Sequence, residues 1–163
     1  MSILEKKYGV VLVDFKECMY LSSENSFTDF DEMTWSVARY VRGSDIYDKS
    51  MLNLPLLHYL QKCKSRVYLM CNEKFGSGAE YDFLNSVIPG VMTGQMFTPT
   101  AESKVDLAEV MIRSGVSRDD LLVISANNDT VRYCKIAKIA SVRPQYIMDR
   151  VFRSIVGEMP QTS

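Results

Sequence analysis

Four consecutive aliphatic residues, Val10 to Val13, lead directly into a carboxylate, Asp14. A run of this kind without a polar residue predicts a central strand buried on both faces, because a strand with one wet face would alternate polar and apolar side chains. In an open α/β sheet, ligands bind at the carboxyl ends of the strands. The segment therefore predicts the central strand of a sheet. It also predicts a site at the carboxyl end of that strand, where Asp14 lies.

Amphipathic segments alternate with further apolar segments along the chain. Apolar residues at helical spacing predict helices over residues 51–62, 80–87, 103–114 and 130–140. Buried strands are expected over 66–71 and 121–124, and a strand or an extended connection over 91–97. Such alternation is typical of a mainly parallel sheet with helices on both faces. The predicted fold class is α/β, a three-layer Rossmann-like sheet.

The length and composition of the chain fit one domain over residues 1–163. With 47% hydrophobic and 24% charged residues, it has the composition of a globular domain. Residues 20–50 are polar and irregular, which predicts a flap or a small insert. The first residues do not resemble a signal peptide, and no apolar run approaches the roughly 20 residues that span a bilayer. We therefore expect a cytoplasmic protein with no membrane partner.

Two groups of side chains bear on the kind of ligand. The four cysteines are scattered and there is a single histidine, so neither a structural zinc site nor a disulfide framework is expected. After residue 130 only two acids accompany the basic residues, which are Arg132, Lys135, Lys138, Arg143, Arg150 and Arg153. This basic region fits either a surface for nucleic acid or an acidic protein, or a solvated helix face without a ligand.

Several segments, in the right order, resemble motifs of the haloacid dehalogenase (HAD) superfamily. The strand ending in Asp14 is similar to the opening motif, in which an apolar strand is followed by two aspartates with one residue between them. Residues 67–72 resemble the second strand, Lys104 the motif lysine that leads a helix, and 121–129 the fourth motif with its acidic residues. The resemblance covers about residues 10–142 and implies a HAD-like fold. Because the 20–50 insert is short, it implies no large cap domain.

The sequence departs from this pattern where active members carry their chemistry. In such members the first aspartate attacks a phosphoryl group, the second is the general acid and base, and a fourth-motif carboxylate helps to hold Mg²⁺. Here Lys16 occupies the acid/base position, Cys71 replaces a hydroxyl residue, and Ser125 stands at the first acidic position of the fourth motif. A lysine ammonium is a poor proton shuttle at neutral pH because it stays protonated.

The expected result is a remnant site of Asp14, Lys16, Cys71, Lys104 and Asp129 that needs no cofactor. Strand alternation places Asp14 and Lys16 on one side of the sheet, so we expect the ammonium of Lys16 to neutralise Asp14 where a cation would otherwise sit. The function implied is a binding or regulatory module for a macromolecule. Its partner would be nucleic acid or an acidic protein surface, met by Arg132, Lys135, Lys138 and Arg143.

Other interpretations remain open for the same residues. One is an active phosphatase on nucleotides or polynucleotide ends, with Asp14 as nucleophile and Mg²⁺ held by Asp14 and Asp129. Another is a metal-dependent nuclease of the PIN or NYN type, for which the candidate carboxylates are Asp14, Glu17, Asp106 and Asp129. These residues could also have purely structural roles. Asp14 would then form a local salt bridge, Lys104 would begin an exposed helix, and Asn128 or Asp129 would cap a helix.

Overall fold

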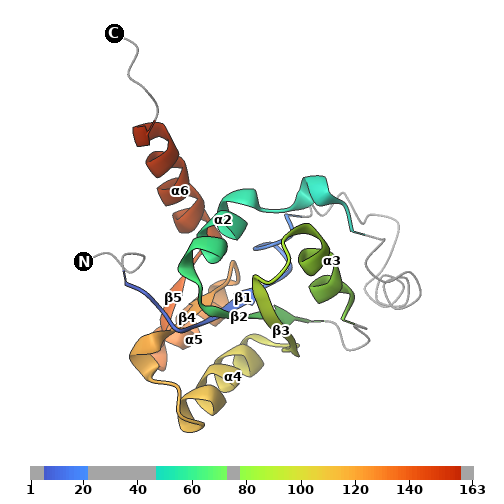
Figure 1. Cartoon of the computed structure of the whole chain (residues 1–163). Coiled ribbons are helices and arrows are strands. Elements are labelled where there is room, and N and C mark those ends of the chain that lie inside the picture. Colours follow the sequence, from blue (N-terminus) through green and yellow to red (C-terminus); the bar gives the residue numbers. More distant parts are fainter. Residues whose placement is uncertain (1–5, 22–46, 73–77, 159–163) are drawn as a thin grey trace.

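A five-stranded parallel sheet organises the protein (Figure 1). The computed structural model describes residues 6–21, 47–72 and 78–158. The strand order is β3-β2-β1-β4-β5, and the strands are β1 Val10–Asp14, β2 Arg66–Cys71, β3 Met92–Phe97, β4 Leu121–Ile124 and β5 Ala140–Val142. The first strand of the sequence is thus the central one, as its aliphatic run predicts, and all five of its residues are buried.

Helices alternate with the strands, as the sequence predicts, and one helix that was not predicted follows the last strand. They are α2 Leu54–Cys63, α3 Ala79–Val87, α4 Ala101–Arg113, α5 Asn128–Ile136 and α6 Pro144–Glu158, with two short 3-10 helices, η3 Lys49–Met51 and η4 Arg118–Asp120. Within the described ranges, every one of these helices is too short or too polar to cross a membrane.

The side chains of β1 divide between two cores, one on each face of the sheet. Val11 and Val13 pack in a cluster with residues of α2, α3 and α6, whereas Val10 and Leu12 pack with residues of α4 and α5. Successive strand side chains point to opposite faces, so one continuous aliphatic run can serve both layers. The three-layer α/β fold class predicted from the sequence is confirmed.

The predicted helix over 130–140 is wrong at its carboxyl end. Helix α5 stops at Ile136, and Lys138 then adopts a left-handed conformation with φ of 59°. The chain turns there into β5, which pairs in parallel with β4 from Ala140. A three-residue strand is too short to show a periodicity of its own, so the sequence pattern predicted no strand there and ended the helix at Ala140. Helix α6, which the sequence pattern did not separate, follows directly.

Polar caps fix where the helices begin, and with them the positions of the site residues. The side chain of Asn53 accepts a hydrogen bond from Leu56 N at the start of α2. At the start of α4, Thr100 and Ser103 form a reciprocal capping box, so this helix begins two residues before the range predicted for it. The capping box places Lys104 in the first turn of α4, beside the carboxyl ends of the strands.

An aromatic cluster anchors both ends of the predicted 20–50 insert, of which residues 22–46 lie outside the described residues. The ring of Phe15 lies 5.4 Å from that of Tyr20 and 5.1 Å from that of Tyr47, measured between centroids. Tyr47 also stacks on Phe83 of α3 and donates a 2.8 Å hydrogen bond to the buried carboxylate of Glu80. These contacts bring residues on either side of the insert together over α3.

Candidate functional site

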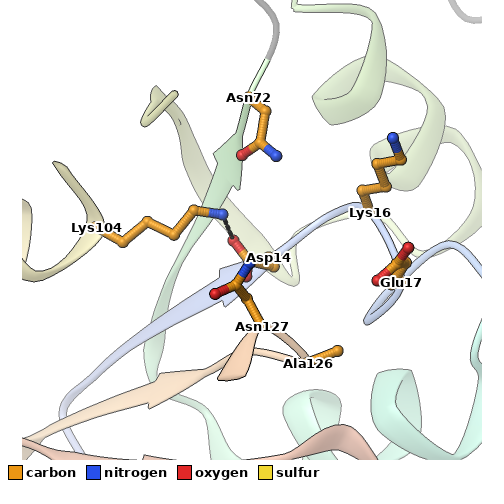
Figure 2. Close-up of a pocket in the computed structure, with 7 residues that line it drawn as sticks. All are labelled: Asp14, Lys16, Glu17, Asn72, Lys104, Ala126 and Asn127. Carbon is orange, nitrogen blue, oxygen red and sulfur yellow. Dashed lines mark hydrogen bonds and ion pairs between the residues drawn. The ribbon is translucent and has the colours of Figure 1, made fainter. Parts of the chain in front are cut away.

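The site is built around Asp14, the last residue of the central strand. Alternation along β1 places its side chain on the same face as Leu12, which is the face covered by α4 and α5. Lys104, from the first turn of α4, donates to Oδ1 of Asp14 in an ion pair (Figure 2). The two residues are only 4% and 5% exposed. The structure therefore joins two of the predicted site residues in a buried pair.

A hydroxyl engages the second oxygen of the same carboxylate. Ser125 follows β4 directly and donates to Oδ2 of Asp14, while its own oxygen accepts a 3.1 Å hydrogen bond from Asn127 N. Ser125 is fully buried. A buried carboxylate is stable only when its charge is paired and its oxygens are hydrogen-bonded. Lys104 and Ser125 together meet that requirement for Asp14.

The prediction that Lys16 neutralises Asp14 is wrong, since Lys104 is its ionic partner. The strand ends at Asp14, and Glu17 adopts a left-handed conformation with φ of 65°. Strand alternation therefore does not apply beyond Asp14. Lys16 is exposed and points away from Asp14 in Figure 2, and none of the ion pairs in the described parts of the chain includes it.

A small polar pocket of about 170 Å³ opens at the carboxyl ends of β1, β2 and β4. Its lining residues are Asp14, Lys16, Glu17, Asn72, Lys104, Ala126 and Asn127 (Figure 2). Two lysines and two carboxylates face this pocket, so its formal charges balance. The pocket lies where the sequence predicts a site, at the edge of a parallel sheet next to its central strand.

Residues 127–129, the end of the segment that resembles a fourth motif, lie at the start of α5. Asn127 is the N-cap, and its side chain accepts a 3.0 Å hydrogen bond from Thr130 N. The cap is therefore Asn127, and the prediction of Asn128 or Asp129 in that role is wrong. Asp129 lies in the first turn, pairs with Arg132 at 3.1 Å, and is exposed. The structure does not bring Asp129 to the pocket with Asp14.

The two cysteines near the site are buried. Cys71 is the last residue of β2, is 4% exposed, and does not line the pocket. Cys18 is fully buried with its sulfur 3.9 Å from the carbonyl oxygen of Ile124. Burial, and after it the charge of Asp14, raise the pKa of the Cys18 thiol. Because the thiolate is the reactive form, Cys18 is suited to packing rather than to nucleophilic chemistry.

Two carboxylates of the pocket, Asp14 and Glu17, are the groups that could hold Mg²⁺ there. This ion prefers octahedral oxygen ligands and usually binds one or two carboxylates. Both oxygens of Asp14 already accept bonds, one from a buried ammonium, and no group of three or more acidic, histidine or cysteine side chains gathers for a metal anywhere in ranges 6–21, 47–72 and 78–158. Of the carboxylates named for a nuclease, Asp14 and Glu17 line the pocket, whereas Asp106 and Asp129 do not.

The basic residues predicted as a partner surface come before and after the edge strand β5 along the chain. Arg132 and Lys135 are exposed on α5, and Lys138 is exposed in the turn before β5. Arg143 is exposed just after β5 and donates a 3.3 Å hydrogen bond to the carbonyl oxygen of Ala126, a pocket residue. The structure thus brings one of these four cations next to the pocket wall.

Sequence analysis did not single out Asn72, Ala126 or Asn127 as residues of one site. Their shared signal is position, because each follows the end of a predicted strand by one to three residues. Comparisons with known proteins assign no family: no protein-family model matches the chain, and no curated protein matches its sequence. The likeness to the HAD superfamily therefore depends on the quoted motifs.

Proposed function

We propose that this chain is a HAD-like protein with a catalytically degenerate site, and that it acts as a binding or regulatory module for a macromolecular partner. The observation that carries the proposal is the closed state of Asp14, whose two carboxylate oxygens accept from Lys104 and Ser125. In this proposal the paired carboxylate stabilises the carboxyl end of the central strand and does not act as a nucleophile.

Two positions near Asp14 at which active HAD members carry carboxylates hold other residues here. A general acid or base must be within hydrogen-bond reach of the reacting atoms and must change its protonation near the working pH. Lys16, two residues after Asp14, is exposed, and Ala126, directly after Ser125, has only a methyl side chain. Neither group holds a divalent cation, which supports a site without phosphatase chemistry.

The partner is proposed to be macromolecular and anionic. Exposed cations at Arg132, Lys135, Lys138 and Arg143 flank β5, and Arg143 contacts the backbone of the pocket residue Ala126. Such a concentration of positive charge raises the local concentration of anionic partners and accelerates their association. A partner bound along β5 would lie next to the remnant site.

The test of a degenerate site is an assay for phosphate release. We expect the purified chain to release no phosphate from p-nitrophenyl phosphate or from 5′- or 3′-phosphorylated oligonucleotides with Mg²⁺ or Mn²⁺. Turnover that depends on the metal and is abolished by Asp14→Asn would overturn the proposal. A matched variant, Asp129→Asn, controls for general loss of charge, because Asp129 lies outside the pocket.

A second experiment tests whether the side chains at positions 16 and 125 are what prevents metal binding. The double variant Lys16→Asp/Ser125→Asp adds carboxylates to the loop and to the residue beside Asp14. We expect the double variant to bind Mn²⁺ in a calorimetric titration and the original chain not to bind it. Equal Mn²⁺ affinity of the two proteins would show that these positions do not control the site.

A further inference from the structure

Helix α6 carries a row of basic and aromatic side chains that the remnant site does not use. Arg143 directly precedes the helix, and within it Tyr146, Arg150 and Arg153 are separated by four and three residues, with Ser154 next to Arg153. Residues spaced in this way lie on one side of a helix. The last four line a hollow of about 390 Å³. We call these five residues the α6 stripe.

The α6 stripe belongs to the part of the molecule where positive charge is concentrated. Between residues 126 and 154 there are six lysines and arginines and two acids, an excess of four, whereas the whole chain carries a net charge of −1. Of the two acids, Asp129 is paired with Arg132, and Asp149 is exposed on α6 three residues after Tyr146. The remainder of the protein is therefore acidic, and this region is the electrostatic target for an anion.

We propose that the α6 stripe binds single-stranded nucleic acid, with phosphates on its arginines and a base stacked on Tyr146. This inference rests on the proposed function and names the partner class. All three cations of the stripe are arginines, whose planar guanidinium group matches two phosphate oxygens at once. The ring of Tyr146 is 41% exposed and lies between Arg143 and Arg150 along the helix, where a base released from pairing can stack.

An acidic protein is the weaker candidate for the same surface. Protein interfaces have a central apolar anchor surrounded by polar groups. The stripe contains no aliphatic side chain, and the exposed Phe152 projects about 100° away from Arg153 around the helix. Charge together with an aromatic platform, without an aliphatic anchor, is the combination that single-strand binding surfaces use.

The dimensions of the stripe suit several consecutive nucleotides. From Pro144, directly after Arg143, to Arg153 the helix rises roughly 14 Å. Figure 1 shows α6 running outward from the sheet beyond α2. The amino-terminal end of the stripe lies next to the pocket, because Arg143 contacts Ala126. A bound strand would thus pass from α6 toward the remnant site.

The test measures binding of the full chain to labelled oligo-U and oligo-dT by fluorescence anisotropy. If three arginines each neutralise a phosphate, log K falls with log salt at a slope of about −2, which is roughly a 20-fold loss of affinity from 50 to 200 mM salt. Both probes are expected to bind. Failure of both to bind at 50 mM salt would overturn the inference.

Variants locate the binding on the α6 stripe. The triple change Arg143→Gln/Arg150→Gln/Arg153→Gln is expected to weaken binding at least tenfold and to flatten the salt dependence. The matched control is Lys49→Gln/Arg66→Gln/Arg113→Gln, which removes the same charge from exposed positions on other elements. Equal losses in the two triple variants would show that net charge alone controls binding, which would overturn the assigned site.

Two further measurements separate the alternatives. Tyr146→Leu is expected to weaken binding about fivefold or more without changing the salt slope, because stacking carries no charge. Unlabelled polyglutamate and unlabelled oligonucleotide, compared at equal total charge, compete with the labelled probe. Equal competition by polyglutamate would favour an acidic protein and overturn the nucleic-acid assignment. Neither result bears on the degenerate site, which only metal-dependent release of phosphate would overturn.

Discussion

Lys104→Met is the change that tests most directly how the site is stabilised. It removes the ammonium from a buried pair whose side chains are 7% and 6% exposed, and leaves the carboxylate of Asp14 with only the hydroxyl of Ser125. Removal of one partner from a buried ion pair costs about 3–5 kcal/mol, because the remaining charge is uncompensated. Methionine has nearly the length of the lysine stem, so packing changes little.

Urea denaturation followed by circular dichroism gives the size of this effect. For a small domain the free energy of unfolding falls by about 1–3 kcal/mol per molar urea. The urea midpoint of Lys104→Met is therefore expected to fall by roughly 2 M. The matched control is Lys135→Met, an exposed lysine on α5 for which a change within about 0.5 kcal/mol is expected. A Lys104→Met midpoint within about 0.3 M of the original would refute the reasoning.

A double-mutant cycle separates the ion pair from the packing of the two side chains. Asp14→Asn alone leaves the ammonium of Lys104 buried without its partner, and is expected to destabilise by a similar amount. The double variant Asp14→Asn/Lys104→Met carries neither charge, and the amide oxygen can still accept from Ser125. We expect a coupling energy of at least about 2 kcal/mol. Additive effects would mean that the two charges do not stabilise each other.

Three further changes test individual contacts. Ser125→Ala removes the hydroxyl that donates to Asp14 and is expected to lower the free energy of unfolding by about 1.5–3 kcal/mol, measured in urea, whereas Ser114→Ala at the exposed end of α4 should cost less. Thr100→Ala breaks the capping box of α4 and is expected to cost about 1 kcal/mol, seen as a fall of roughly 2–4 °C in Tm. Burial raises the pKa of the Cys134 thiol from 9.0 to about 11, so stability is expected to fall as pH rises through this range, because the unfolded chain loses the proton first. A Cys134→Ala variant with the same decline between pH 9 and 11 would contradict that assignment.

The strands of the interior were predictable because burial on both faces leaves a local signature. The ranges predicted for β2 and β4, 66–71 and 121–124, are the observed ones, since a doubly buried strand needs an uninterrupted apolar run. The edge strand β5 left no such signature. Two of its three residues are only partly buried and three positions give no periodicity, so the sequence pattern predicted no strand there and ended a helix at Ala140.

What the sequence determined by itself was the sheet, its central strand and the place of Asp14, because these follow from apolar runs and from the direction of parallel strands. Which lysine meets Asp14 was decided only by the tertiary structure. Lys16 is two residues away in sequence, but the chain leaves the extended conformation after Asp14 and turns it outward. Lys104 is 90 residues away and is brought to the carboxylate by the cap of α4 and the packing of that helix on β1. A local pattern specifies neighbours along the chain, whereas a buried charge is neutralised by whichever group the packing brings within reach.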